Sequence, residues 1–331
     1  MVYVYKKLVS GKPYYYLRVS KREGKKVVTK DLAYLGSDIN NVRKEINNLS
    51  KYKSEIRKAY RKINIFLETE YYKNKVISFK LKEDIFLEKQ LIELEAIRLH
   101  YINNFKKQDL ITKKEILNNF IINFSYNTTS IEGNTITLKE AQNLLEEGKT
   151  PKDKTLREIY DLQNTQRVFE KLVDSKVKIT HKFIEDLHKE LMLNIDNRIG
   201  YRIKDVKVFR SHFESTPGSY VKSDMDLLLK WYNENLKKLH PFVLAVIFHH
   251  KFEKVHPFMD GNGRTGRMLM NVILMNNNYP PMIISRKDRS EYLDCLSSVD
   301  DINLIQIDEK YEKLIRFVVS GMTSFYWNIF L

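Results

Sequence analysis

The sequence predicts a mainly helical protein that begins with a small β-meander. Glycine (11) and proline (7) are scarce among the 331 residues, which favours long helices over many short strands. Apolar residues recur at helical spacing along most of the chain after about residue 40. Residues 2–35 differ, because they are short aromatic and β-branched runs separated by glycine-containing turns.

Composition excludes several classes of protein. Apolar residues make up 43% and charged residues 30%, as in soluble globular proteins and unlike disordered ones. The single cysteine, Cys295, excludes an internal disulfide framework and a cysteine zinc cluster. The apolar runs are shorter than the ~18–20 residues of a membrane span, and the N-terminus lacks the apolar run of a signal peptide. We therefore expect a soluble cytoplasmic protein without membrane association.

Positive charge is concentrated at the N-terminus. The net charge is +15, and residues 1–60 hold 15 basic against 5 acidic side chains. A basic segment rich in tyrosine is compatible with a nucleic-acid-binding regulator. The simpler interpretation, a solvated face on a small domain, is favoured because no known base-reading motif lies there.

Capping residues and apolar spacing predict the individual elements. Residues 2–35 are expected to form three strands, and Asp38 or Asn40 caps a helix over about 40–75. Thr112 is expected to cap a helix that ends at the corner beginning with Glu132. Further helices are expected over 82–105, 155–173, 180–192, 223–236, 242–255, 263–276, 288–298 and 308–329, with a capping box at 137–140 and a short hairpin or flap within 200–221.

The segment from His256 to Arg267, HPFMDGNGRTGR, gathers complementary chemical groups. Pro257 disfavours helical backbone at His256, so the imidazole is expected where a helix ends. The glycines allow close approach of a ligand, and successive N–H groups that open a helix can bind an anion. One carboxylate, Asp260, follows the histidine, and Mg²⁺ typically uses one or two carboxylates with substrate phosphates.

Two arginines extend this segment into the next helix. Arg264 and Arg267 are three residues apart and share a face, which Asn271 continues. A polyphosphate bound to Mg²⁺ would satisfy the base, the carboxylate, the N–H groups and both guanidiniums. The competing interpretation is a glycine-rich loop in which Asp260 pairs with an arginine for stability alone. It leaves the other groups of the segment unexplained.

This segment resembles the signature of the Fic family, HPFx(D/E)GNGRxxR, at every specified position. The resemblance extends over roughly 110–300 and leaves 1–60 outside. It implies a helical Fic core with a short β-hairpin flap. The implied division is a basic meander with the start of a helical spacer (1–60), a helical region with an inhibitory helix at about 113–133 (61–175), the Fic catalytic core (176–300) and a C-terminal helix (301–331).

The resemblance implies transfer of AMP from Mg²⁺-ATP to a Ser, Thr or Tyr hydroxyl of a protein, with release of pyrophosphate. His256 would be the general base, Asp260 would hold Mg²⁺ and Phe258 would anchor the loop. The target protein would dock by β-augmentation on the flap near Val206–Phe213, and we expect auto-AMPylation. The implied nucleotide contacts are Gly261, Asn262 and Gly263 around the phosphates, Arg264 on the β-phosphate, Arg267 on the γ-phosphate and Asn271 on the adenine side.

Residues Thr128–Gly133 match the family's inhibitory pattern, (S/T)xxxE(G/N). The implied brake is an ion pair between Glu132 and Arg267 that blocks the γ-phosphate site. Taken alone, the segment is equally a helix C-terminus that ends at Gly133. The intact active-site signature favours the brake. Removal of AMP from a modified protein, with Glu132 acting on water, remains open as the alternative reaction.

Other polar and aromatic residues are expected to have core or surface polar roles. His249 and His250 do not fit a metal-binding pattern, and adjacent helical histidines point to different faces. Tyr292 and Arg289 resemble positions near the family's base pocket, although an aromatic at helical spacing is more often a core residue.

Overall fold

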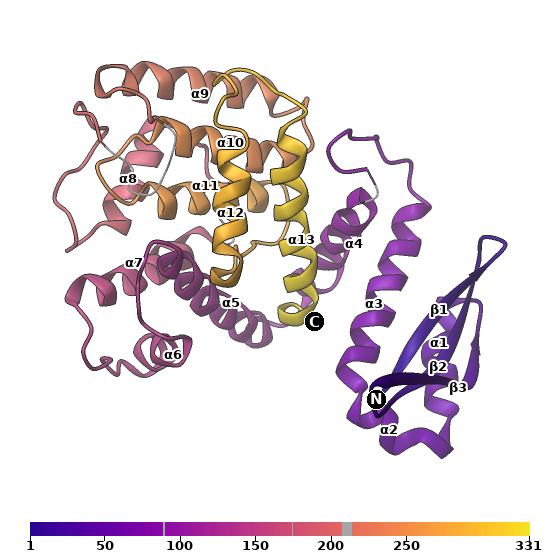
Figure 1. The fold of residues 1–331 in the computed structure, drawn as a ribbon. Coiled ribbons are helices and arrows are strands. Elements are labelled where there is room, and N and C mark those ends of the chain that lie inside the picture. Colours follow the sequence, from indigo (N-terminus) through magenta and orange to yellow (C-terminus); the bar gives the residue numbers. More distant parts are fainter. Residues whose placement is uncertain (89, 174, 207–213) are drawn as a thin grey trace. The chain divides into compact units, whose positions relative to one another are not determined.

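The computed structural model describes residues 1–331 except 89, 174 and 207–213. The chain divides into two compact units. The N-terminal unit comprises Met1–Lys82, Glu95–His100 and Leu331, and the helical unit comprises Glu83–Leu94 and Tyr101–Phe330. The predicted fold class is confirmed, because helices predominate and the small antiparallel sheet lies at the N-terminus (Figure 1).

The N-terminal unit is a sheet covered on one face by helices. Its strands β1 (Val2–Val9), β2 (Lys12–Glu23) and β3 (Lys26–Gly36) pair antiparallel in chain order. Alternate side chains such as Val4, Leu17 and Leu35 point into a core shared with the following helices. Those helices are α1 (Ile39–Asn48), α2 (Lys53–Lys58) and α3 (Tyr60–Ile77).

The prediction of one helix over 40–75 is wrong. Asp38 caps α1 as expected, but the chain turns through a short 3₁₀ segment at Ser50–Tyr52 and breaks again at Ala59. Ile46 of α1 and Ile63 of α3 belong to the same core. The two helices also pack against each other, which a single straight helix could not do.

The helical unit is built around one buried helix, α10 (Pro241–Val255), which packs against α9, α11 and α13. Its side chains are buried almost all round, as expected for a helix at the centre of a core. Helix α4 (Gln90–Asn103) contributes residues 95–100 to the N-terminal unit. The other helices are α5 (Leu110–Ile131), α6 (Leu138–Glu147), α7 (Leu156–Leu172), α8 (His181–Leu191), α9 (Val221–Asn235), α11 (Asn262–Asn276), α12 (Arg289–Ser297) and α13 (Tyr311–Ile329).

Helix starts show where sequence prediction succeeds and fails. The capping box of Thr137 and Glu140 is confirmed at α6. The expected cap at Thr112 is wrong, because α5 begins at Leu110 and the carboxylate of Asp109 accepts N–H groups of its first turn. A carboxylate also gains from the helix dipole, which a threonine hydroxyl does not. Similarly, α4 starts later than predicted and α9 starts earlier, at the end of a 3₁₀ turn.

The predicted flap at Val206–Phe213 lies, apart from Val206, outside the described residues. Its described flanks, 200–206 and 214–217, have irregular backbone. Among the helices that the structure describes, none is both long and apolar enough to cross a membrane.

Candidate active site

The predicted loop joins α10 to α11 and begins at His256. His256 ends α10 with left-handed backbone angles (φ 51°, ψ 60°), in agreement with the effect expected of Pro257. Its carbonyl accepts a hydrogen bond from Nε of Arg202 at 2.7 Å, and the same guanidinium donates to the Val255 carbonyl at 3.2 Å. Arg202 is buried and fixes the backbone of His256. The sequence motifs assign no such role to Arg202.

The imidazole of His256 is partly buried among polar side chains. Burial lowers its pKa to about 4, from an ordinary value of 6.5. Within the described part of the chain, its Nδ1 atom has no hydrogen-bond partner. The ring is therefore neutral at pH 7, as a general base must be.

The middle of the loop is held rigid from two sides. Phe258 is fully buried and stacks on His188, with ring centroids 3.7 Å apart. The amide of Asn262 bonds both the N–H and the carbonyl of Phe258, each at 2.8 Å. Nε2 of His188 lies 2.9 Å from the Asp260 carbonyl. The anchoring role predicted for Phe258 fits this geometry, and the amide of Asn262 is used within the loop.

Glycines at the start of α11 leave room that other residues would fill. Gly261 has φ +77°, and a Cβ there would lie 2.7 Å from Sδ of Met192. A Cβ on Gly263 would lie 2.1 Å from Oε1 of Glu132. The carboxylate of Glu132 therefore rests against the first turn of α11, where exposed N–H groups and the helix dipole favour an anion.

Glu132 and Arg267 form the ion pair that the sequence predicts. The guanidinium donates to Oε1 of Glu132 at 2.7 Å and to the side chain and carbonyl of Thr128 at 2.8 and 3.0 Å. Arg267 is 3% exposed, whereas the Glu132 side chain is 43% exposed. Burial opposes ionisation of Glu132, but the charge of Arg267 outweighs it and lowers the pKa of Glu132. Both groups are therefore charged at neutral pH.

Helix α7 supplies two partners that the sequence did not reveal. Asp161 forms a buried ion pair with Arg264, and Arg157, one turn earlier, pairs with Asp260. Arg264 also lies 3.5 Å from Asp260. Neither α7 residue belongs to a motif, and only the folded chain brings them to the loop.

The carboxylate of Asp260 fits a magnesium ligand. Burial raises its pKa, but the hydrogen bond from Arg157 and the charge of Arg264 outweigh burial, so the pKa lies below its usual value. The side chain is 31% exposed and thus open to solvent. An ionised, accessible oxygen beside an anion-binding helix start is the donor that Mg²⁺ prefers.

Residues expected near an adenine base are engaged in packing. Oδ1 of Asn271 accepts the N–H of Met282 at 2.7 Å, and its amide group donates to the carbonyls of Met282 and Arg267. The hydroxyl of Tyr292 lies 2.5 Å from Nε2 of His249, deep in the core. His249 and His250 are core residues, as expected, and Cys295 is buried.

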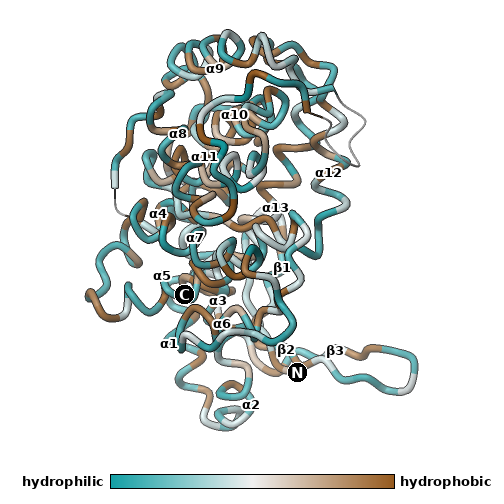
Figure 2. Tube along the Cα trace, turned by 90° about the vertical axis from the view of Figure 1, so that its left-hand side faces the viewer, coloured by the Kyte–Doolittle hydropathy of each residue, from teal (hydrophilic) through white to brown (hydrophobic). Residues whose placement is uncertain are grey.

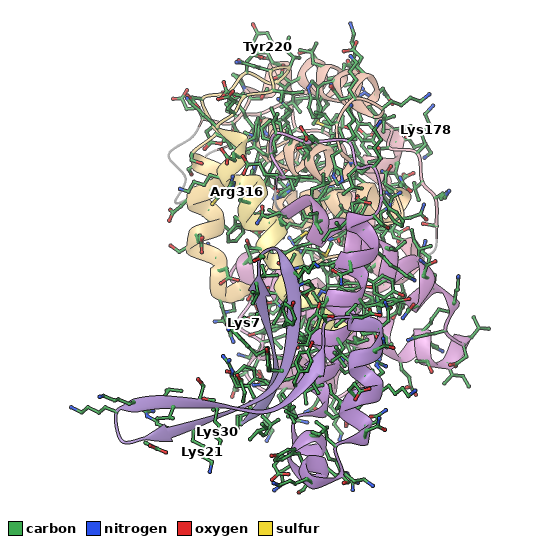
Figure 3. The ribbon with its side chains drawn as sticks, turned by 90° about the vertical axis from the view of Figure 1, so that its right-hand side faces the viewer. Lys7, Lys21, Lys30, Lys178, Tyr220 and Arg316 are labelled. Atoms are coloured by element: carbon green, nitrogen blue, oxygen red, sulfur yellow. The ribbon has the colours of Figure 1, made fainter. Side chains whose placement is uncertain are left out.

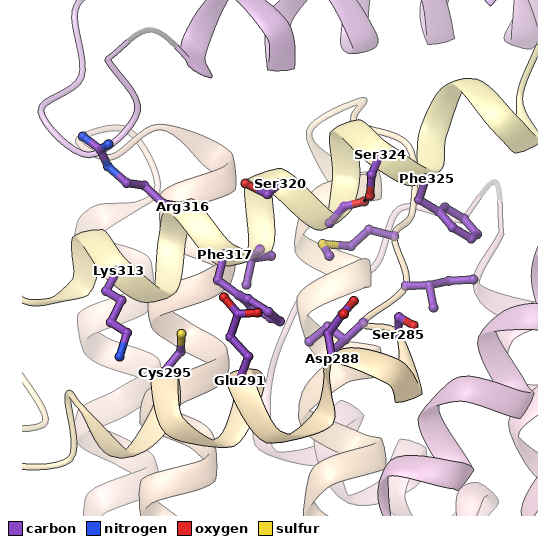
Figure 4. A pocket seen from close by; sticks show the side chains of 15 residues that line it. Ser285, Asp288, Glu291, Cys295, Lys313, Arg316, Phe317, Ser320, Ser324 and Phe325 are labelled. Carbon is purple, nitrogen blue, oxygen red and sulfur yellow. Dashed lines mark hydrogen bonds between the residues drawn. The ribbon is translucent and has the colours of Figure 1, made fainter. Parts of the chain in front are cut away.

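A cavity of about 560 Å³ lies beside α12 and α13 (Figure 4). Phe317 and Phe325 line it together with charged side chains such as Glu291 and Lys313. It contains none of the residues predicted for the site. The chemistry of the loop, rather than the size of a cavity, locates the candidate active site.

The fold and the loop define a helical domain with an anion-receiving turn at the start of a buried helix. Residues 178–274 match the model of the Fic/DOC family, within the stretch of about 110–300 over which the sequence resembles that family. "Protein adenylyltransferase Fic" of Drosophila erecta is 35% identical over 176 residues, which are 50% of this chain and 34% of that protein. The protein of the same name from Drosophila virilis is 32% identical over 219 residues, 62% of this chain and 43% of that protein.

The chain thus spans less than half the length of these curated relatives. Among solved structures, Fic-1 from C. elegans has a TM-score of 0.63 at 24% identity, over 87% of this chain and 86% of that chain. A Fic-domain signaling protein from Bacteroides thetaiotaomicron has a TM-score of 0.62 at 22% identity, over 70% of this chain and 92% of that chain. These likenesses show a shared fold.

Proposed function

We propose that the chain is a self-inhibited protein adenylyltransferase, which moves AMP from Mg²⁺-ATP to a Ser, Thr or Tyr hydroxyl of a protein. The Fic domain and the names of its relatives support this assignment. One observation carries it: the carboxylate of Glu132 rests against Gly263 and pairs with Arg267. An anion thus already lies at the helix start, beside a neutral imidazole and the ionised carboxylate of Asp260.

The reaction needs a base, a charge-neutralising site and a fixed geometry. Neutral His256 takes the proton of the target hydroxyl. The hydroxyl oxygen bonds to the α-phosphorus of ATP, and the bond between the α-phosphorus and the oxygen that leads to the β-phosphate breaks. Pyrophosphate leaves with its negative charge close to Arg264 and Arg267. Asp260 would hold Mg²⁺, which supplies further neutralisation of phosphate charge when bound. Positioning by the rigid loop supplies much of the remaining rate increase.

Glu132 would act as a brake on this reaction. While Arg267 is paired with Glu132, it cannot contact the γ-phosphate. A charge-assisted contact of this kind is worth about 1.5–3 kcal/mol, so its loss slows the reaction roughly 10- to 150-fold. The carboxylate also lies where the phosphates would approach the start of α11. Displacement of Glu132 would free Arg267 for the γ-phosphate and would clear the start of α11 for the phosphates.

The target protein is proposed to dock beside Val206–Phe213. Three partly buried hydrogen bonds hold the described residues on either side of this segment. Arg202 donates to the carbonyls of Lys204 and Thr216, and Oδ1 of Asp205 accepts the N–H of Gly218 at 2.7 Å. Arg202 thus joins the described flanks of the docking segment and the His256 backbone to one guanidinium. This linkage favours a target held close to the catalytic base.

The proposal is tested by labelling Glu132→Gly protein with ATP that carries its label on either the α- or the γ-phosphate. We expect stable protein label from α-labelled ATP alone, and none after His256→Ala is added. His181→Ala, a partly exposed histidine outside the loop, is the matched control and should label normally.

Label from γ-labelled ATP, or equal label with and without His256, would overturn the proposal. Release of AMP from an AMP-modified protein by the wild type, with no labelling of Glu132→Gly, would replace it with the reverse reaction. Circular dichroism of each variant confirms that the fold is intact.

A further inference from the structure

The sheet of the N-terminal unit has a second face that its helices do not cover. Side chains that alternate with the buried ones place five tyrosines there: Tyr3, Tyr5, Tyr14, Tyr16 and Tyr34. The buried core of this unit uses the opposite face, where Tyr15 packs against Phe66. A soluble protein rarely places so many aromatic rings together on an open sheet face without a ligand or partner for them.

Strand register brings Tyr14, Tyr16 and Tyr34 close together. Tyr5 pairs with Tyr16, and Tyr16 pairs with Tyr34, so one row crosses all three strands. The ring centroids of Tyr16 and Tyr34 are 5.4 Å apart, and those of Tyr14 and Tyr34 are 6.4 Å apart. Tyr34 is 55% exposed. Tyr14, Tyr16 and Tyr34 therefore form a partly exposed tyrosine cluster with ring faces available for stacking.

Arg18 lies beside this cluster in a fixed position. Its guanidinium carbon lies 3.6 Å from the centre of the Tyr5 ring, and its NH2 group donates to Asp31 at 3.2 Å. Lys7 pairs across the strands with Tyr14, and Lys12 precedes it on β2. The aromatic face is thus bordered by positive charge, as the labelled Lys7 in Figure 3 illustrates.

The hairpin of β2 and β3 continues beyond β1 as a two-stranded arm. Pairing with β1 ends at Val19, and every residue from 21 to 30 is exposed. The arm is mostly hydrophilic in Figure 2, and Figure 3 marks Lys21 and Lys30 on it. Its charged residues are five basic ones, Lys21, Arg22, Lys25, Lys26 and Lys30, against the single acidic Glu23.

We propose that this face and arm bind single-stranded nucleic acid, with bases stacked on the tyrosine cluster and phosphates held by the arm. Stacking on aromatic side chains beside a basic surface is how proteins bind single strands without reading sequence. A duplex hides its base faces, so it could use the arm but not the cluster. An acidic protein segment would match the charge but offers no planar bases. The proposal is independent of the AMP-transfer site.

The test measures fluorescence anisotropy of the full-length chain with labelled single strands of about 20 nucleotides, longer than a typical single-strand site. Oligo-dT, oligo-U and a duplex of equal length are compared over a salt series. The stacking variant is Tyr16→Ala with Tyr34→Ala, and its control is Tyr60→Ala on α3, which is 62% exposed. The charge variant is Lys25→Glu with Lys26→Glu, and its control is Lys51→Glu with Lys53→Glu, exposed residues of the same unit.

We expect both single strands to bind more tightly than the duplex. The stacking variant should lose roughly 5- to 100-fold in affinity with an unchanged salt slope. The charge variant should reduce the magnitude of the slope of log binding constant against log salt concentration by about 1.4. Two phosphate contacts are lost, and each contributes ~0.7 on a single strand. Both controls should bind like the wild type.

Three results would overturn the proposal. They are no binding at low salt, tighter binding of the duplex than of either single strand, and wild-type affinity in the stacking variant. A preference of oligo-U over oligo-dT, or the reverse, would support it and identify the natural strand. The charge variant changes only exposed residues, so its result does not depend on the packing of the sheet.

Discussion

At the scale of single residues, burial and charge prepare His256 and Asp260 for opposite roles. Burial keeps the imidazole of His256 neutral, while Arg157 and Arg264 keep the carboxylate of Asp260 ionised. A base must accept a proton at pH 7, and a magnesium ligand must be charged there. For Asp260, one of these neighbours, Arg157, lies far away in the sequence, whereas Arg264 lies four residues away.

The pKa of His256 predicts the pH dependence of AMP transfer. Because that pKa lies at about 4 instead of 6.5, the base stays unprotonated as the pH falls from 8 to 6. Single-turnover rates of Glu132→Gly should therefore be nearly constant over this range and decline only towards pH 4. A rate that is half-maximal near pH 6.5, with the fold intact by circular dichroism, would contradict this assignment.

The ion pair of Arg157 with Asp260 predicts that removing Arg157 lowers the Mg²⁺ concentration needed for ATP binding. It competes with Mg²⁺ for Asp260, and its side chain is 55% exposed. An exposed pair of this kind is worth ~0.2–1 kcal/mol. Arg157→Ala should therefore lower the Mg²⁺ concentration for half-maximal ATP binding by roughly 1.5- to 5-fold, measured by calorimetry. Lys152→Ala, a nearby exposed cation, is the control. A higher Mg²⁺ requirement in Arg157→Ala would show that Arg157 assists the metal.

At the scale of elements, the end of α5 determines where Glu132 lies. Nε of Arg289 donates to the Ile131 carbonyl at 2.7 Å, and Arg267 holds Thr128 one turn earlier. The backbone of α5 is thus fixed from two sides of the helical unit, immediately before Glu132, the residue proposed as the brake.

Arg289→Ala should weaken the brake without changing the ion pair itself. The last turn of α5 would lose one charge-assisted bond, worth about 1.5–3 kcal/mol at most. We expect faster hydrogen exchange at residues 129–133 and auto-AMPylation between the wild-type and Glu132→Gly rates. Lys287→Ala, in the adjoining 3₁₀ turn, should leave both unchanged. Faster hydrogen exchange without any gain in labelling would contradict the prediction, because it would show that the order of the last turn of α5 does not control inhibition.

Sequence reasoning succeeded where the information is local. The loop from His256 to Arg267 is contiguous, so its residue types and spacing predicted a single site. The capping box of Thr137 and Glu140 was equally visible, because both partners lie within four residues. Arg157, Asp161, His188 and Arg202 were missed, since each reaches the loop from another helix or segment and belongs to no motif. The cap at Asp109 was missed because Thr112 offered a similar local signal.

At the scale of the whole molecule, buried histidines predict sensitivity to acid. Burial lowers the pKa of His100, His188 and His256 to about 4, and that of His249 to about 3. The unfolded chain therefore binds more protons between pH 6.5 and 4, and stability falls as the pH falls through this range. Burial also lowers the pKa of His250. Glu253, with its pKa raised to about 8 by burial, and Asp161, whose pKa burial also raises, act in the opposite direction but are fewer than the histidines.

The urea midpoint at pH 5 should thus lie below that at pH 7. Each imidazole contributes up to ~2 kcal/mol over these 1.5 pH units below 6.5. Equal midpoints, or a higher one at pH 5, would contradict the buried, neutral state of these rings. Measurements at two salt concentrations exclude a general effect of the net charge.

The central claim is that Glu132 restrains an otherwise competent AMP transferase. Its most direct test is the single-turnover rate of auto-AMPylation at saturating Mg²⁺-ATP for the wild type, Glu132→Gln and Glu132→Gly. We expect Glu132→Gly to be roughly 10- to 150-fold faster than the wild type, because Arg267 is released. Glu132→Gln should lie between them, since it removes the charge but keeps the bulk against Gly263. Equal rates in all three proteins would show that the Glu132–Arg267 pair is structural and not a brake.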